Sequence, residues 1–553
     1  MRTAGADGVA AGRLRPSPRL SLTPVVLLGL VVAAPVLSVL AHLGRQDDGL
    51  LRHLAATVLW EYIANSLWLC AGVGILTGSV GAGCAWLVTM YRFPGRRIFA
   101  WALLLPLAMP AYVLAYAYTD FLQVTGPLQS WLRQVTGLGV RDYWFPEIRS
   151  LGGAVFVLSM ALYPYVYALA RAAFVEQSQC ALEVSRTLGC TGFGAFHRVG
   201  LPLARPAVAA GISFVLMETL ADFGAVSYFG IPTFTTGIYR AWYALGSPVA
   251  AAQLSSLLLL AVLGVLLGER ALRGRARFTA STTHIFRKTL PRLDGLRGMA
   301  AAGLCFLPVL FGFLLPAGVL VTMAIDSLET PPTERLLALA ANTVSLGVLA
   351  ALLLGATALT TLFTVRRDHT GLGRQLVRLA TLGYAVPGAV IGVGILLVIG
   401  AVDHAMAELV GGRGLVLGGT IVALLYGYLV RFFAVAYGPL EAGLTKIGNN
   451  LEDAARLLGA GAFGVFARVQ VPLLRPALTS AMLLVFVDVM KELPATMILR
   501  PFNFDTLAVE AFRLATTERL DGAALPSLFI VVAGLVPVIL LVRMGERRRH
   551  TTV

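Results

Sequence analysis

The chain has 553 residues, of which 57% are hydrophobic and 13% are charged, and its mean hydropathy is +0.79. A soluble domain carries about a quarter charged residues, so this composition excludes a soluble globular protein and predicts an all-α polytopic membrane protein. The formal net charge of +15 does not indicate a nucleic-acid-binding protein, because the arginines lie in short segments between apolar runs, as the positive-inside rule describes.

Twelve apolar runs, each of about 20 residues and therefore long enough to cross a bilayer, follow one another along the chain. The first run is long enough to span, so we interpret it as a helix that is kept rather than a cleaved signal. An even number of spans leaves both termini on one side, and the basic residues at both ends predict that this side is the cytoplasm. The predicted spans are 22–42, 64–90, 98–119, 151–173, 206–229, 249–268, 299–325, 342–365, 379–400, 414–437, 476–499 and 525–543.

A basic linker at 269–297 separates the two sets of six spans and falls on the cytoplasmic side. It predicts a division of the chain into a first half, 1–285, and a second half, 286–553. The long loop 120–150 falls on the outer side. Kinks are predicted at the prolines in the third span of each half, which are Pro106, Pro110 and Pro387.

No motif for catalysis, a metal or a cofactor is present in the sequence. The five cysteines form no CxxC pair and the seven histidines form no HxxxH pair, so neither a zinc site nor a disulfide framework is expected. The dipeptide Gly-Lys, which a P-loop requires, never occurs. The chain is therefore expected to hydrolyse no ATP itself and to have no catalytic residues, no metal site and no cofactor.

The two halves contain a repeated segment that runs in the same direction in both. Residues 182–205 read LEVSRTLGCTGFGAFHRVGLPLAR, and residues 452–475 read EDAARLLGAGAFGVFARVQVPLLR. The copies match at an offset of 270, which pairs Gly189 with Gly459. Earlier in each half the offset is 277. Further matched pairs are Pro202 and Pro472 at the first offset, and Asn65 and Asn342, Arg97 and Arg374, and Pro110 and Pro387 at the second. Two copies with one orientation predict a symmetry axis along the membrane normal.

Each repeated segment lies between the fourth and fifth predicted spans of its half and resembles the EAA loop of ABC importer permeases. That motif reads Glu-Ala-Ala, three residues, Gly, nine residues, an aliphatic residue, one residue and Leu-Pro. The second copy places Asp453, Ala454, Ala455, Gly459 and Pro472 at these positions. The spacing is intact, and Asp replaces the motif's Glu.

The first copy keeps the same spacing with Glu183, Gly189 and Pro202, and it has Val-Ser in place of the two alanines. Small residues allow a helix to approach another surface closely, the Gly supplies a left-handed turn, and the Pro fixes the start of the next segment. The resemblance implies that each segment is a coupling helix docked on an ATPase subunit, and two segments imply two ATPase copies. An amphipathic helix that packs on its own bundle would explain one copy, but two matched copies favour coupling.

The whole chain resembles the fused permeases of ferric iron importers. The strings KELPAT at 491–496 and LRPFNFDTLA at 499–508 are the part that points to iron. The resemblance implies a type I importer permease fold in a bacterial inner membrane, with a periplasmic binding protein that delivers the cargo and a separate ATPase subunit. Related fused permeases carry thiamine, and others are assigned to phosphonates, so these substrates stay as alternatives.

Ionisable residues lie near the end of the fifth predicted span of each half. Glu218 and Asp222 match Asp488 and Glu492 at the offset of 270; each pair is spaced i, i+4 and shares a helix face, and Lys491 lies beside the second pair. Because a charge at the bilayer centre costs a few kcal/mol, such residues face a cavity or a partner. They line the transport pathway or its gate, or they form a structural network in which Lys491 pairs with a carboxylate. Their oxygen atoms suit a hard cation such as ferric iron, but we expect no stable metal site.

A secondary transporter driven by an ion gradient is the alternative from another class, with Glu218 and Glu492 as its coupling groups. That alternative does not explain the duplicated loop. A membrane enzyme is a third interpretation, and the sequence offers no constellation of His, Cys or Ser residues to carry its chemistry.

Overall fold

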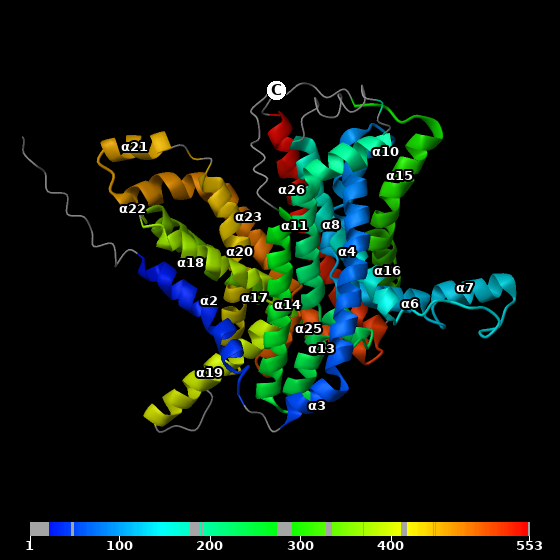
Figure 1. Cartoon of the computed structure of the whole chain (residues 1–553), viewed down its shortest axis with the longest axis horizontal. Coiled ribbons are helices and arrows are strands. Elements are labelled where there is room, and N and C mark those ends of the chain that lie inside the picture. Colours follow the sequence, from blue (N-terminus) through cyan, green and yellow to red (C-terminus); the bar gives the residue numbers. More distant parts are fainter. Residues whose placement is uncertain are drawn as a thin grey trace, which may run out of the picture.

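The protein is a bundle of long helices, most of which run from one face of the molecule to the other (Figure 1). In this computed structural model, no β-strand occurs among the residues that the structure describes. Those residues are 22–45, 49–176, 189, 192–273, 290–327, 334–368, 370–410, 417–445, 447 and 449–550. The predicted boundary between the halves at residue 285 lies outside them.

The helices follow one another in two runs. The first run comprises α2 (Thr23–Ala41), α3 (Leu50–Thr57), α4 (Leu59–Met90), α5 (Arg96–Ala102), η1 (Leu105–Ala108), α6 (Ala111–Leu122), α7 (Pro127–Thr136), α8 (Leu151–Glu176), α10 (Gly192–Ala195), η2 (Phe196–Gly200), α11 (Leu201–Ala221), α12 (Gly224–Tyr228), α13 (Phe234–Tyr239), η3 (Arg240–Ala244) and α14 (Pro248–Arg273).

The second run comprises α15 (Gly295–Val309), η4 (Leu310–Leu314), α16 (Leu315–Ser327), α17 (Glu334–Arg366), α18 (Leu372–Thr381), η5 (Leu382–Ala385), α19 (Gly388–Val410), α20 (Ile421–Leu444), α21 (Asn449–Leu457), α22 (Ala462–Val465), η6 (Phe466–Gln470), α23 (Val471–Met490), α24 (Pro494–Leu499), α25 (Leu507–Thr516) and α26 (Leu520–His550). The π-helical turns η2 and η6 occupy matched positions before α11 and α23, so the repeat extends to this local irregularity.

The prediction of about twelve membrane spans is confirmed. Among the described residues, eleven helices are long and apolar enough to cross a membrane, and a bent pair of segments makes up to twelve. The bent pair joins Arg96–Ala108 to Ala111–Thr136 at an angle of 93°. The bend falls at Pro110, where the backbone is extended, because proline cannot donate the hydrogen bond that would continue a helix.

The fifth span of each half begins and ends earlier than predicted: the candidate spans are Phe196–Ala221 and Ala462–Met490, where the sequence placed 206–229 and 476–499. The helix α11 ends at Ala221 and the short helix α12 begins at Gly224, while α23 ends at Met490 and α24 begins at Pro494. Hydropathy alone does not reveal such a break, because the residues on both sides of it are apolar. The breaks fall at the ionisable residues that the sequence singled out.

The two halves exchange their peripheral helices. The helix α2 packs against α18 and α19 of the second half, and α16 packs against α6 of the first half and against α26. Two hydrophobic cores result. One combines the middle helices of the first half with α15, α16, α25 and α26, and the other combines the middle helices of the second half with α2, α13 and α14. Each core therefore depends on both halves of the chain.

The helices α4 and α8 cross closely at a glycine. A Cβ added at Gly81 would lie 2.9 Å from the Tyr167 backbone nitrogen and 3.0 Å from the Tyr163 carbonyl oxygen. Backbone atoms cannot move aside as a flexible side chain can, so this position accepts no side chain. Two residues along, an added Cβ at Gly83 would meet no atom within 4 Å.

Replacing Gly81 should therefore separate the two helices. Gly81→Ala should destabilise the protein by about 1–3 kcal/mol, the usual cost of overpacking a core. The matched control Gly83→Ala should be neutral or slightly stabilising, because alanine favours the helix more than glycine does. Thermal unfolding of the two variants in detergent measures the difference. Equal melting temperatures would contradict the close crossing.

Candidate functional site

A cavity lies at the centre of the molecule, where the two halves meet. It encloses about 880 Å³ including the part that is open to solvent, and both halves line it. The first half contributes residues from η1, α6, α8 and α11, and the second contributes residues from η5, α20 and α23. All five ionisable residues predicted as pathway or gate candidates line this cavity: Glu218, Asp222, Asp488, Lys491 and Glu492.

The cavity walls are built from matched positions that carry different side chains. At the offset of 270, Ala161 of the first half matches Arg431 of the second, and Ala221 matches Lys491. At the offset of 277, Leu107 matches Tyr384. The scaffold is therefore duplicated while the chemistry of the wall is not: both cationic groups and the Tyr384 hydroxyl come from the second half.

Asp222 and Glu492 hold the two helix breaks together. An oxygen of Asp222 accepts hydrogen bonds from the backbone N–H groups of Ala225 and Val226, each at 3.1 Å. The Asp222 backbone carbonyl also accepts the Thr235 hydroxyl at 2.7 Å. Both donors to the side chain lie in the first turn of α12, whose amides have no partner within the helix. The carboxylate supplies the missing acceptor.

Glu492 repeats this arrangement in the second half. Its two carboxylate oxygens accept the backbone N–H groups of Ala495 at 2.9 Å and Thr496 at 2.8 Å. The Thr496 hydroxyl also donates to the carboxylate and lies 2.8 Å from the Tyr428 hydroxyl. Glu492 is buried. The matched pair Asp222 and Glu492 therefore has a structural role that the sequence analysis did not separate from a role in transport.

The pairing of Lys491 is also decided by the geometry. Its ammonium nitrogen lies 2.8 Å from Asp488, three residues earlier on the same helix end. Glu492, the other carboxylate beside it, is held by amides instead. The sequence offered a structural ion pair or a lining of the transport pathway. The ion pair is present, and both of its members also line the cavity, so the two interpretations do not exclude each other.

Glu218 differs from the other three carboxylates. It accepts no backbone amide among the described contacts, and Tyr384 of the second half lines the same cavity near it. The nearby cations, Arg431 and Lys491, also belong to the second half. Glu218 therefore lies near cationic groups of the second half, but among the described residues it forms no ion pair with them.

Arg431 is a charged cavity residue that sequence reasoning missed. Only 8% of its surface is exposed, its Nη1 donates to the Val386 carbonyl at 3.4 Å, and its Nε has no hydrogen-bond partner among the described residues. A single arginine inside the predicted span 414–437, where the matched residue is Ala161, was the available signal. A buried guanidinium beside a cavity can interact with passing charge, because its charge is screened less than a surface charge.

The cavity does not have the composition of a metal cage. No group of three or more His, Cys, Asp or Glu side chains is placed to hold a metal ion within the described part of the chain. Two of the four carboxylates are engaged by backbone amides and a third by Lys491. Three of the four cavity carboxylates are therefore committed to contacts within the protein.

The second repeated loop lies at one end of the bundle (top of Figure 1), and α10 of the first loop lies at the same end. We name this end the loop face. Gly459 adopts a left-handed backbone with φ of +84°, Gly189 one with φ of +82°, and Pro472 lies in the first turn of α23, as the motif predicts. Residues 182–188, including Glu183, lie outside the described residues.

Glu452, the residue before the motif, binds the buried side of α21 to α17 and to η6. Glu452 is 5% exposed, pairs with Arg366 at the end of α17, and accepts the Gln470 side-chain amide at 2.7 Å. Asp453 and Ala454, by contrast, are exposed and Ala455 is half-buried. The predicted motif residues thus lie on the open side of α21, and its anchor, Glu452, was not predicted.

The exposed side of the second repeated loop carries large apolar side chains. Leu457 and Leu458 are each 89% exposed, and Phe463 is also exposed. Monomeric surfaces rarely expose such a group of large apolar side chains together, and where they do the patch usually marks an interaction site. The patch is continuous in sequence with Asp453 and Gly459.

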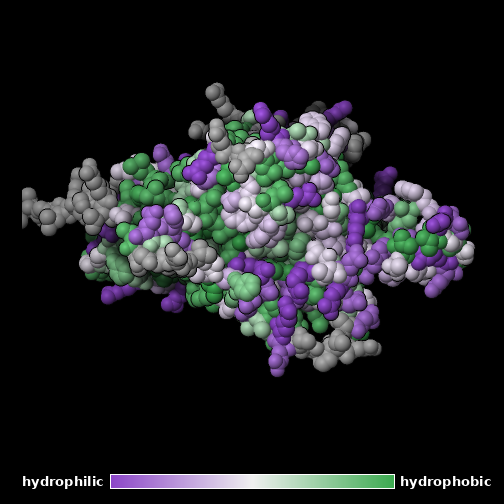
Figure 2. Space-filling model, turned by 90° about the horizontal axis from the view of Figure 1, so that it is seen from below, coloured by the Kyte–Doolittle hydropathy of each residue, from purple (hydrophilic) through white to green (hydrophobic). Residues whose placement is uncertain are grey.

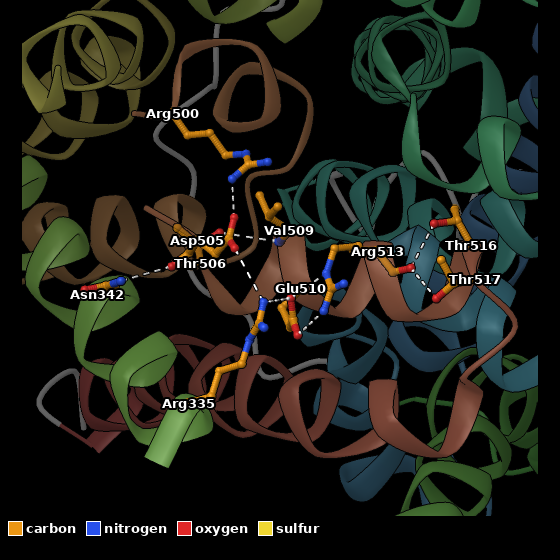
Figure 3. Close-up of polar contacts among 10 residues, drawn as sticks. All are labelled: Arg335, Asn342, Arg500, Asp505, Thr506, Val509, Glu510, Arg513, Thr516 and Thr517. Atoms are coloured by element: carbon orange, nitrogen blue, oxygen red, sulfur yellow. Dashed lines mark hydrogen bonds and ion pairs between the residues drawn. The ribbon is translucent and has the colours of Figure 1, made fainter. Parts of the chain in front are cut away.

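The LRPFNFDTLA string forms a polar network with the start of α17 (Figure 3). Arg335 pairs with both Asp505 and Glu510, Arg513 pairs with Glu510 at 2.7 Å, and Arg500 pairs with Asp505. Asn342 donates to the Asp505 carbonyl at 3.3 Å, and the matched Asn65 donates to the Pro232 carbonyl at 2.9 Å. The string therefore fixes the segment that leads into α25, rather than lining the cavity.

Comparison with known proteins gives a consistent picture. A family model described as "binding-protein-dependent transport system inner membrane component" matches twice, at residues 73–273 and 347–551. The chain is 26% identical over 94% of its length to the Fe(3+)-transport system permease protein FbpB 2 of Haemophilus influenzae, of which the match covers 96%. It is 24% identical over 86% of its length to the putative ferric transport system permease protein FbpB 1 of the same organism, of which the match covers 76%. It is also 26% identical, over 40% of its length, to the sulfate transport system permease protein CysT of Escherichia coli, of which the match covers 77%.

The ion pair in the cavity can be tested by removing its members one at a time. Lys491→Met should lower the stability of the assembled protein by on the order of 2 kcal/mol, because it leaves Asp488 without its charged hydrogen-bond partner. The double variant Lys491→Met with Asp488→Asn should recover that stability, since no charge is then stranded. Glu492→Gln should not be rescued by Lys491→Met, because Glu492 serves the α24 amides instead.

Protein yield, melting temperature and uptake distinguish the two roles of the pair. Lys491→Arg, which keeps the charge, is the control. Recovery of stability without recovery of uptake in the Asp488 and Lys491 double variant would assign the pair to transport. Recovery of both would show that it is structural only.

Proposed function

The chain belongs to the family of binding-protein-dependent transport system inner membrane components, the permeases of ABC importers, and we propose that its cargo is ferric iron. It is a multi-pass inner-membrane protein, and ATP hydrolysis belongs to a separate subunit of the importer. The observation that carries the proposal is the match to a ferric permease across nearly the full length of both proteins. The sulfate permease is matched over less than half of this chain.

The cavity supports this cargo on chemical grounds. Four carboxylates line it, and oxygen ligands are those that a hard cation prefers. Because three of the four are already engaged, no tight site holds the cargo, and a transporter needs such weak contacts in order to release it. Thiamine or a phosphonate would be alternative cargoes of the same machinery.

In the proposed complex the loop face is cytoplasmic, and with it both termini. Two copies of a cytoplasmic ATPase subunit dock on the two repeated loops, and a periplasmic binding protein delivers the cargo at the opposite end. The exposed leucines 457 and 458 and the fixed underside of α21 support the docking role. Movement of the ATPase subunits would then pass through the loops into α11 and α23, which end at the cavity.

The coupling role predicts a separation between ATP hydrolysis and uptake. Gly459→Trp and Gly189→Trp should leave the permease in the membrane but uncouple hydrolysis from uptake, because each glycine has a left-handed backbone that disfavours a side chain and because a bulky group blocks docking. The second loop should be the more sensitive, since it keeps the Asp-Ala-Ala form.

Gly438→Trp is the matched control. A Cβ added at this glycine of α20 would meet no atom within 4 Å, as at Gly189 and Gly459, but Gly438 lies outside the repeated loops. ATPase activity and uptake of the reconstituted complex are the measurements. Normal values of both in the two loop variants would show that the loops do not couple.

The cargo is tested with the complex purified together with its ATPase and the binding protein that co-purifies, reconstituted in proteoliposomes. ATP-dependent uptake of radioactive ferric iron is expected, and excess thiamine, phosphonate or sulfate should not compete with it. ATP-dependent uptake of one of those competitors without iron uptake would replace iron as the cargo while leaving the importer assignment intact.

A further inference from the structure

The helix α7 stands apart from the bundle. The segment that begins at the cavity with Ala111 continues through α6, turns at residues 123–126 and runs on as α7, away from the other helices (Figure 1). It extends sideways at about the level where α16 ends, on the side of the molecule away from the loop face. Figure 2 views the molecule from that side and shows the same projection beyond the rest of the molecule, with apolar and hydrophilic residues side by side on it.

The polar face of α7 is turned toward its own loop. Gln129 is buried, its amide donates to the Leu122 carbonyl at 2.7 Å, and its oxygen accepts the Tyr143 hydroxyl at 2.8 Å. Arg133 also donates to the Tyr143 hydroxyl, at 3.2 Å. The loop that contains Tyr143 runs beneath α7 in Figure 1, on the side away from the loop face. The polar groups of this face are therefore satisfied within the segment itself.

The opposite face of α7 is apolar, and two of its three large side chains are exposed while Leu128 is half-buried. Leu128, Trp131 and Val135 are spaced i, i+3, i+7 and form one stripe along the helix. Trp131 is 58% exposed and Val135 is 64% exposed. A helix on a soluble protein has the reverse arrangement, with its apolar stripe inward and its polar face outward.

This inverted arrangement belongs to the first half alone. After the matched prolines Pro110 and Pro387, the first half has α6, a turn and α7, whereas the second half has the continuous helix α19. Near the end of α19 the exposed side chains of His404 and Glu408 lie 3.3 Å apart as a polar pair. The projecting apolar helix is therefore not a requirement of the shared fold.

We propose that α7 lies in the membrane interface of the outer leaflet, with its Leu128–Trp131–Val135 stripe in the bilayer and its loop in the aqueous phase. The polar loop lies on the side away from the loop face, so the stripe faces the other way, toward the level of the bilayer through which the spans run. Tryptophan is enriched at this depth of a membrane, and an amphipathic helix binds there by burying its apolar face. The bilayer is therefore the occupant, rather than a soluble protein on the outer side.

The membrane-bound α7 would be connected to the cavity by one continuous segment of the chain. The first residues of α6, Ala111 and Tyr112, line the cavity, and α7 lies at the far end of the same segment, on the outer side of the bend at Pro110. Holding α7 in the interface fixes the outer end of this segment relative to the bilayer. Its inner end is then the part that is free to shift when the cavity changes shape.

The proposal is tested by tryptophan fluorescence of the full chain reconstituted in lipid vesicles, with no need for cargo, ATPase or binding protein. The signal of Trp131 is obtained as the difference between the native protein and Trp131→Phe. We expect lipids brominated near the upper part of their acyl chains to quench this signal and aqueous iodide to leave it largely unchanged. The signal of Trp68, an exposed residue of the span α4, obtained in the same way from Trp68→Phe, is the positive control for the brominated lipid.

Quenching of the Trp131 signal by iodide but not by brominated lipid, with Trp68 behaving as expected, would overturn the proposal and assign the stripe to a soluble partner. Phenylalanine preserves the apolar character of both positions, so the variants are expected to fold. The result is independent of the identity of the cargo, and failure of iron uptake would leave it unchanged.

Discussion

The structure depends on how two helices are interrupted inside a membrane. Lipid offers no hydrogen-bond partners, so a helix can break there only if the protein itself satisfies the freed backbone groups. Asp222 and Glu492 do this at matched positions, each accepting two amides from the short helix that follows. Because α11 and α23 stop there, the chain can turn at the centre of the molecule, and the cavity lies beside both turns. The buried carboxylates are thus needed for the fold before any role in transport is considered.

The two halves share a backbone scaffold, but the side chains that line the cavity differ between them. Features that decide the backbone recur in both halves: the helix breaks, the π-helical turns, the left-handed glycines, and the asparagines that donate to the carbonyls of Pro232 and Asp505. Side chains that face the cavity do not decide the backbone and can differ between the halves. Ala161 and Ala221 of the first half therefore occupy the positions that match Arg431 and Lys491 of the second. Each half therefore contributes two carboxylates to the cavity wall, whereas the cationic groups that line it, Arg431 and Lys491, both come from the second half.

The sequence predicted what depends on composition and repetition, and it missed what depends on geometry. Apolar length is enough to predict spans, and the offset of 270 brings Glu218, Asp222, Asp488 and Glu492 to one cavity. The sequence could not show that α11 ends at Ala221 and α23 at Met490, because a turn between two apolar segments does not change the hydropathy. The partner of Lys491 stayed open because Asp488, three residues before it, and Glu492, directly after it, are both close to it in sequence. Glu452 was overlooked because it stands beside the motif, and its burial depends on Arg366, 86 residues away.

The anchoring of α21 suggests how movement at the loop face would reach the cavity in the proposed importer. Glu452 is tied to Gln470, the last residue of the π-helical turn that leads directly into α23. The helix α23 has 20 residues, which corresponds to about 30 Å at 1.5 Å per residue, and it ends at the residues that line the cavity. A stiff helix of this length carries a displacement to its far end, where Lys491 and the Glu492 turn form the wall. The link to Arg366 means that α17 must follow the same movement, so the loop cannot shift α23 without shifting the helix beside it.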